Sequence, residues 1–373
     1  MKFAILAISM KPPKKPHQLL PKLHSWIHRH PRRTYALLAL GVILALGLIA
    51  AAILLTPKNT PQPIKQVTVT KKAKPAPVYY SPLTGNKVAT QAATKQAVTA
   101  IMIENSPDAR PQSGLKDAGI VYEAIAEGGI TRFLALYQEA KPQLIGPVRS
   151  IRMYYVDWLA PYQASVAHIG GSYAALQEVR NGGYRDIDQF FNAPYYWRAN
   201  DRYAPHNVYT SFEKLDALNK SKGYTESTFQ GFSRVDGKAS TTPTATSIDM
   251  NFSSALFNTH YDYDSASNTY LRSIAGEPSN DREAGRISPS AVVALKVNMV
   301  TVLEDGYRQS IETTGKGTAY VFQNGTVTEC TWQKDSRAAP LQLITADGKP
   351  LPLVRGQTWI GAIPNGQGSV AWK

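Results

Sequence analysis

The feature that most constrains this chain is an uncharged run from Thr34 to Pro57, TYALLALGVILALGLIAAAILLTP. Its apolar core, Tyr35 to Leu55, has 21 residues. As a helix this core is about 32 Å long, at roughly 1.5 Å per residue, and it matches a bilayer hydrocarbon core of about 30 Å. The apolar region of a secretory signal is shorter, about 7 to 15 residues. The run therefore predicts a transmembrane helix over residues 34–56.

Basic residues flank this run on both sides, and Arg32 and Arg33 are the ones nearest to it. By the positive-inside rule we expect a cytoplasmic N-terminus and external C-terminal domains, with a single pass through the cell membrane. Residues 1–33 then form a basic cytoplasmic tail. Residues 57–79, rich in proline and lysine, are expected to be an extended linker that separates the folded part from the membrane.

The positive charge of the chain is confined to its N-terminal part. The formal net charge is +14, but the first 103 residues hold 15 of the 41 lysines and arginines and no acidic residue. The remaining 270 residues hold 26 basic and 27 acidic residues. A nucleic-acid-binding domain would carry its positive charge on the folded surface. We therefore expect no nucleic acid among the partners.

Strands alternate with helices in residues 80–230, which predicts a mixed α/β domain. Helical spacing places Ile151, Tyr154, Tyr155 and Trp158 on one stripe, and Ser211 is a candidate helix N-cap. We expect strands at 99–105, 120–126, 131–139 and 164–170, and helices at 150–162, 172–183 and 211–223.

Residues 246–373 have a different pattern, and 231–247, rich in small and turn-forming residues, mark the boundary. Asn324-Gly325 lies between alternating strands and predicts a type I′ hairpin, and Asp347-Gly348 repeats this pattern. This part is therefore expected to be a mostly antiparallel β domain, and the fold class is α+β. The single cysteine, Cys330, is interpreted as a buried strand residue rather than a catalytic thiol.

Charged residues interrupt an otherwise buried strand pattern at IVYEAIAEGGITRF, residues 120–133. If Gly128-Gly129 is a two-residue turn, Glu127 lies opposite Ile130, Ile125 opposite Arg132, and Glu123 opposite Leu134. Glu123, Glu127 and Arg132 would then share one face of the hairpin. Because buried charges seldom stabilise a fold better than apolar packing, a ligand site is one interpretation. An internal ion network is the other.

Further polar groups follow in short motifs. Arginine pairs well with carboxylate and phosphate groups, so their convergence indicates an anionic ligand. Arg149 and Arg152 are three residues apart at a predicted helix start, where both can point the same way. The additional candidates are Asp157, His168 before two glycines, and Asp201, Arg202, His206 and Asn207 in NDRYAPHN.

Several established motifs are missing from the sequence. There is no G-x-S-x-G, no H-E-x-x-H and no P-loop. Asp, Glu and His residues are present, but no spacing typical of metal ligands marks them. We therefore expect neither a cofactor nor a metal ion.

Longer stretches of the sequence resemble a known family. IMIENSPDARPQSGLKDAGIVYEAIAEGGITRF, IGPVRSIRMYYVDW, AHIGGS and APHNVYT are similar to the YerB-like family, bacterial envelope proteins that are often lipoproteins and carry a DUF3048 domain in two halves. The resemblance covers residues 80–373. It implies an extracytoplasmic protein with a two-part fold, and it implies no particular activity. This chain departs from the family in having a membrane helix rather than a lipidated cysteine. The family's polar motif positions correspond to Asn105, Arg110, Glu123, Glu127, Arg132, Arg149, Arg152, Asp157, His168 and His206.

Two classes of function remain open. The first is a binding or regulatory module for a cell-wall polymer or an envelope protein, in which the charged side chains recognise the ligand or hold the fold. The second is a hydrolase or lyase acting on cell-wall glycan or peptidoglycan. There Glu127, or Glu123, would be the general acid, with a pKa raised by burial and by the neighbouring carboxylate. Arg132, Arg149 and Arg152 would bind an anionic group of the polymer.

Overall fold

The computed structural model describes residues 31–55, 77–302 and 308–373. The chain forms two compact units, Met1–Lys74 and Pro75–Lys373. Most of the tail expected at 1–33 and nearly all of the linker expected at 57–79 lie outside the described residues, and residues 31–33 belong to the helix described next.

Helix α2 is the described part of the first unit and runs from Pro31 to Leu55. None of its residues is buried, and its length and composition are sufficient to cross a membrane. A run this rich in Leu and Ala favours a helix despite Gly41 and Gly47, and in water its apolar surface would be left exposed. A helix is therefore confirmed in this segment, at Pro31–Leu55 where 34–56 was predicted.

Three further α-helices lie in the second unit: α3 (Met153–Leu159), α4 (Tyr173–Asn181) and α5 (Phe212–Ser221). The stripe predicted around Tyr154 and Trp158 is buried. The predicted N-cap of α5 is confirmed, because the Ser211 hydroxyl accepts a hydrogen bond of 3.3 Å from the Lys214 backbone amide.

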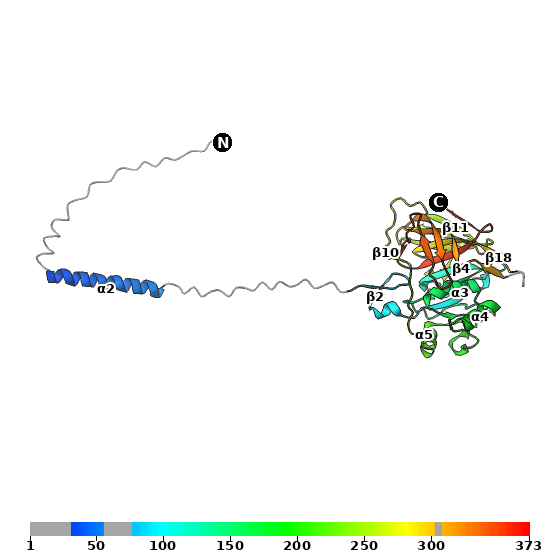
Figure 1. Ribbon diagram of the computed structural model, residues 1–373, viewed down its shortest axis with the longest axis horizontal. Helices are drawn as coiled ribbons and strands as arrows, with labels where there is room; N and C mark the ends of the chain where they lie inside the picture. The colour runs from blue at the N-terminus through cyan, green and yellow to red at the C-terminus, as the bar shows by residue number, and fades with distance from the viewer. Residues whose placement is uncertain (1–30, 56–76, 303–307) are drawn as a thin grey trace, which may run out of the picture. The chain divides into compact units, whose positions relative to one another are not determined.

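A ten-stranded sheet runs through the second unit (Figure 1). It places β24 beside β4, β4 beside β5 and β5 beside β3. Its strands in spatial order are β22 (Gln342–Ile344), β21 (Thr326–Lys334), β20 (Gly315–Gln323), β17 (Ala291–Val297), β24 (Thr358–Pro364), β4 (Ile120–Glu127), β5 (Ile130–Tyr137), β3 (Thr99–Glu104), β6 (Ser165–Ala167) and β7 (Arg185–Asp186).

A second, five-stranded sheet and several two-stranded ladders complete the unit. The five-stranded sheet has the order β14 (Glu277–Pro278), β13 (Thr269–Ile274), β12 (Thr259–Asp264), β11 (Ser247–Asn251) and β25 (Ser369–Trp372). The ladders are β1 (Tyr79–Tyr80) with β2 (Lys87–Val88), β8 (Trp197–Arg198) with β9 (Val208–Tyr209), β10 (Arg234–Val235) with β23 (Leu353–Val354), β15 (Asn280–Asp281) with β16 (Gly285–Arg286), and β18 (Met299–Thr301) with β19 (Gln309–Ile311).

The two faces of the large sheet carry separate apolar cores. Side chains alternate along each strand, so Tyr122 and Leu134 pack with α3 in one core. Val121 and Phe133 point the other way and pack with α5 and with the five-stranded sheet. We refer to these as the α3 face and the α5 face. The chain is of the α+β class, as expected.

The two halves of the unit are not separate domains, and the division expected at 80–230 and 246–373 is corrected here. Strand β24 of the second half pairs in parallel with β17 of its own half and with β4 of the first half. All seven residues of β24 are buried, as is usual for a central strand covered on both faces. The cyan strands of the first half and the orange and red strands of the second therefore belong to one body (Figure 1). The sequence pattern indicates that a segment is a strand, but it does not name the strand's neighbour.

Turn chemistry in the second half agrees with the sequence at one position and differs at the other. Asn324 and Gly325 have φ angles of 58° and 77°, so the predicted type I′ hairpin between β20 and β21 is confirmed. The Asp347-Gly348 turn closes only a single bridge between Ile344 and Pro350. The following strand, β23, instead pairs in parallel with β10.

Candidate functional site

The hairpin of β4 and β5 contains a β-bulge. Glu127 lies opposite Ile130, as expected, but the register shifts between Ile125 and Glu127. Arg132 therefore faces Ala124 rather than Ile125. An extra residue in one strand moves every side chain beyond it to the opposite face.

The bulge separates the charged residues that the sequence groups together. Glu123 lies opposite Phe133 on the α5 face, whereas Arg132 lies on the α3 face with Leu134. Glu127, beyond the bulge, is on the same side as Arg132 and forms an ion pair with it. The prediction that Glu123, Glu127 and Arg132 form a single cluster is therefore wrong. It holds only for a regular two-residue hairpin, and this hairpin contains a bulge.

Glu123 is completely buried in an ion pair with Arg272 of β13, at 2.9 Å. Its carboxylate also accepts a hydrogen bond of 2.9 Å from the Trp359 indole and one of 3.0 Å from the Thr131 hydroxyl. The Asn105 amide donates to Thr131 at 2.6 Å. A fully enclosed carboxylate cannot reach a ligand, so Glu123 is structural and the internal ion network is the correct interpretation for this half of the group.

Glu127 is held by two arginines at the edge of the α3 face. Arg132 binds one carboxylate oxygen at 3.1 Å and Arg152 binds the other. Arg132 also donates to the Ser150 carbonyl at 2.7 Å. Burial alone would raise the pKa of Glu127, but the two guanidinium groups outweigh it and the pKa lies below its usual value. The raised pKa that a general acid requires is absent.

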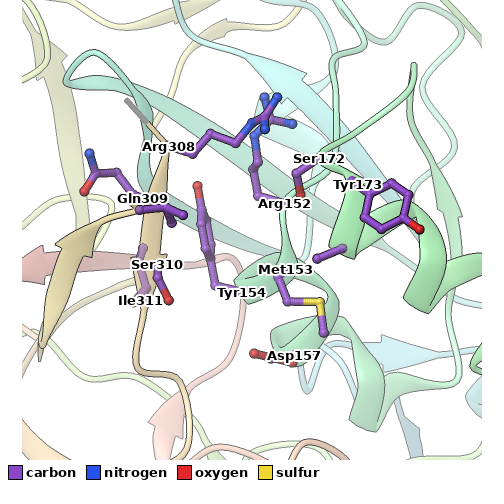
Figure 2. A pocket seen from close by; sticks show the side chains of 12 residues that line it. Arg152, Met153, Tyr154, Asp157, Ser172, Tyr173, Arg308, Gln309, Ser310 and Ile311 are labelled. Carbon is purple, nitrogen blue, oxygen red and sulfur yellow. The ribbon is translucent and has the colours of Figure 1, made fainter. Parts of the chain in front are cut away.

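A cavity of about 790 Å³ opens beside this ion cluster. Arg152 and Arg308 lie at one end of it and Asp157 lies at the other (Figure 2). The Arg308 backbone pairs with Glu127, which brings the second arginine to the same ion cluster. The remaining wall consists mainly of side chains from α3, the start of α4 and β19: Met153, Tyr154, Ser172, Tyr173, Ala174, Val302, Gln309, Ser310 and Ile311.

Guanidinium groups gather at the arginine end of this cavity. The single carboxylate of Glu127 is shared between Arg132 and Arg152, and Arg308 lines the same end of the cavity (Figure 2). At the far end Asp157 binds Arg337 at 2.6 Å and the Thr313 hydroxyl at 2.6 Å. The cavity can therefore accept an anionic group next to Arg152 and Arg308, with apolar atoms along Met153 and Ile311.

The other candidates are distributed over two further places. Arg149 does not accompany Arg152, because it precedes the helix and lies 3.4 Å from Glu104. His206 also binds Glu104, at 2.9 Å. His168 is completely buried and lies 3.0 Å from Asp186, so it is a structural histidine. Asn105 belongs to the buried network of Glu123, while Arg202 lies beside His206 on a second cavity.

Sequence reasoning missed Arg272, Arg308 and Glu104. For Arg272 a signal was present, because it occupies an inward position between Tyr270 and Ile274 in an alternating strand. An arginine in such a position needs a buried acidic partner. Within the described residues no group of three or more His, Cys, Asp and Glu side chains could hold a metal ion. Cys330 is a buried strand residue, as expected.

Family models match both halves of the chain. The "Protein of unknown function (DUF3048) N-terminal domain" matches residues 83–225, and the "Protein of unknown function (DUF3048) C-terminal domain" matches residues 248–360. The interval between the two matches coincides with the boundary at 231–247, although one sheet crosses it.

One curated relative and one solved structure extend this result. The chain is 35% identical over 292 residues to "Putative lipoprotein YerB" of Bacillus subtilis (strain 168), covering 76% of this chain and 86% of the relative. The crystal structure of YerB protein from Bacillus subtilis matches with a TM-score of 0.71 at 30% identity, over 79% of this chain and 99% of that one. Together with α2, this relative indicates a membrane-anchored envelope protein. The chain therefore belongs to the DUF3048 family and is similar to YerB through both halves of its fold.

Proposed function

We propose that this protein is a membrane-tethered binding module of the cell envelope that holds an anionic group in the cavity beside α3. The observation that carries this proposal is the arginine end of the cavity, where Arg132 and Arg152 share the single carboxylate of Glu127. A guanidinium pairs in a fork with carboxylate or phosphate, which makes either group a suitable ligand.

The membrane arrangement follows from α2 and its flanks. The chain crosses the membrane once, with its N-terminus in the cytoplasm and residues 75–373 outside. The basic pair Arg32 and Arg33 at the start of α2 supports this orientation. A relative named as a lipoprotein is consistent with external placement. The ligand is then a cell-wall polymer or the external part of an envelope protein.

The shape of the cavity favours a ligand with an apolar or ring-like body next to its anionic group. Tyr173 is largely exposed at the start of α4 and forms part of the wall, and Met153 is a flexible apolar side chain that adapts to irregular shapes. An acidic sugar or an acidic peptide of the wall combines these two properties. A simple inorganic anion does not use the apolar wall.

The alternative, a wall hydrolase or lyase with Glu127 as general acid, loses its chemical basis. The carboxylate of Glu127 binds Arg132 and Arg152, and these two arginines lower the pKa of Glu127. Glu123 is enclosed with Arg272. We therefore assign recognition rather than acid catalysis to this site.

The direct experiment is co-sedimentation of residues 75–373 with isolated cell walls. This fragment keeps both apolar cores, since their described members lie between residues 83 and 370. We expect Arg308→Gln to weaken wall binding about tenfold or more, because a charge-assisted pair is lost. Tyr173→Ala should weaken it less. The matched control is Arg355→Gln, which removes an arginine that binds Asp236 and lines neither this cavity nor the one beside His206.

Two results would overturn the proposal. One is wall binding by Arg308→Gln and Tyr173→Ala that equals that of the unchanged fragment. The other is release of soluble wall fragments that stops in Glu127→Gln, which would restore the enzyme interpretation.

A further inference from the structure

A second cavity of about 750 Å³ lies away from α3 and shares no lining residue with the first. The loop that follows β3 forms one side of it, and the loop that joins β8 to β9 forms the other. Its lining residues are Asp108, Arg110, Pro111, Asp201, Arg202, Tyr203, Ala204, His206 and Arg282. Nearly all of them are polar, so this cavity suits a charged ligand better than an apolar one.

His206 is oriented by a buried carboxylate behind it. Its Nδ1 lies 2.9 Å from a carboxylate oxygen of Glu104, which is only 4% exposed. The Ser106 hydroxyl donates to the same oxygen at 2.9 Å. Since Nδ1 donates to Glu104, Nε2 is the ring atom left on the cavity side, where its nearest carboxylate is Asp108 at 4.0 Å.

Three arginines surround His206, and two of them bind neutral oxygens. Arg202 donates to the carbonyls of Asp108 and Pro111, at 2.9 and 2.6 Å. Arg110 donates to the carbonyls of Asn105 and Leu256, at 3.0 and 2.8 Å. Within the described part of the chain neither of these arginines forms a salt bridge, so carbonyl groups rather than carboxylates hold their guanidinium groups in place.

The third arginine, Arg282, is exposed and binds Asp201 at 2.5 Å. Burial, and the nearby charge of Arg272, lower the pKa of Arg110 to about 10, which leaves it cationic at neutral pH. The cavity wall thus has three arginines and two aspartates. One of the aspartates, Asp108, is highly exposed and can turn away to admit an anion.

We propose that this second cavity is a binding site for a phosphate group, in which Arg202 and Arg282 supply guanidinium donors and His206 contributes Nε2. A phosphate presents three or four oxygens in different directions, and donors that come from two loops and from Arg282 fit this arrangement. A carboxylate offers only two oxygens in one plane, so it matches donors from three directions less well. Tyr203, the most exposed aromatic residue of the cavity, is free to contact the group that carries the phosphate.

The test is titration of residues 75–373 with inorganic phosphate and with glycerol phosphate, followed by calorimetry. We expect saturable binding that weakens about tenfold or more in His206→Gln and in Arg282→Gln. The controls are His260→Gln and Arg355→Gln, which remove a carboxylate-bound histidine and a carboxylate-bound arginine that line neither cavity.

Thermal unfolding of each variant accompanies the titration. Arg282 is exposed and its replacement should leave the fold intact, so this variant decides the matter if His206→Gln does not fold. The proposal is overturned if the unchanged fragment does not bind phosphate, or if folded Arg282→Gln binds it with unchanged affinity. The two cavities share no lining residue. A failure to bind phosphate in the second cavity therefore does not affect the wall-binding test of Arg308→Gln, and a failure of that test does not affect the phosphate titration.

The same titration distinguishes two sources of the phosphate. A soluble poly(glycerol phosphate) chain represents a wall polymer, and vesicles of phosphatidylglycerol represent the membrane surface. Competition of the soluble polymer with inorganic phosphate, without vesicle binding, identifies the polymer. Vesicle binding that inorganic phosphate and Arg282→Gln abolish identifies the lipid headgroup.

Discussion

Glu123 and Arg272 form an ion pair that the protein encloses completely, at 0% and 1% exposure. The Arg272 guanidinium also lies 4.5 Å from the Trp359 ring centre, and the Trp359 indole donates to Glu123. Glu123 belongs to the first half of the chain, whereas Arg272 and Trp359 belong to the second. The pair therefore connects the two sheets across the α5-face core.

Breaking this pair should be costly. We expect Glu123→Gln to lower the free energy of unfolding by about 3 to 5 kcal/mol, because it leaves the Arg272 charge buried without a carboxylate. The double variant Glu123→Leu with Arg272→Met should lose less, since no charge remains buried. Urea unfolding measures both changes. Equal stability of Glu123→Gln and the unchanged protein would contradict the structural role.

His260 provides a pH-dependent contribution on the outer face of the five-stranded sheet. Partial burial alone would lower its pKa, but Asp249 at 2.8 Å and Asp262 at 3.1 Å outweigh this and raise it. A pKa raised by folding stabilises the folded state fully below the pKa of the unfolded chain, about 6.5, and this stabilisation is lost as the pH rises through the folded pKa.

The prediction is a difference between two pH values. At pH 5.5 the melting temperature of His260→Gln should lie below that of the unchanged protein, and at pH 8.5 the two should nearly coincide. Differential scanning calorimetry at both values measures this. A deficit that is larger at pH 8.5 would have the wrong sign and would refute the assignment.

The bulge of β4 is the element that decides which charges meet. It brings Glu127 to the side of Arg132 and Arg152, and it leaves Glu123 on the opposite face. The strands, their order in the hairpin and the glycine turn could be predicted from alternation and from Gly128-Gly129. The bulge could not be predicted, because the end of β4 pairs with the segment at Arg308 of the same chain. That segment lies far from β4 in the sequence.

Helix α5 permits a quantitative test of a local prediction. Ser211 caps it through its side chain, whereas Ser172, at the same position of α4, makes no such hydrogen bond. We therefore expect Ser211→Ala to lower the free energy of unfolding by about 1 kcal/mol, and Ser172→Ala to lower it by only a few tenths. Chemical denaturation of both variants measures the difference. A larger loss for Ser172→Ala would contradict the cap assignment.

On the scale of the whole molecule, a single sheet unites two sequence segments that family models treat as separate. Strand β24 lies between β17 and β4, and it returns from the end of the chain to complete the first half. Local sequence signals predicted the three helices of the second unit and the hairpin at Asn324-Gly325. They could not predict this pairing, nor the separation of Arg149 from Arg152, because both depend on contacts between residues distant in the chain.

The shared sheet predicts that neither half folds alone. Residues 75–245 lack β24, so β4 would present an unpaired buried edge, which is prone to aggregation. We expect this fragment to show no cooperative thermal transition, whereas residues 75–373 should unfold in one transition. Calorimetry of the two fragments decides this. Independent cooperative transitions for residues 75–245 and 246–373 would show two autonomous domains.

The central claim is that the cavity with Arg152 and Arg308 is where an anionic envelope ligand binds. The most direct measurement is NMR shift mapping of residues 75–373 during titration with soluble, acidic fragments of digested cell wall. We expect the largest amide shifts at residues 152–154, 172–174 and 308–311, and we expect Arg308→Gln to abolish them. Saturable binding with its shifts confined to other parts of the surface would contradict this claim.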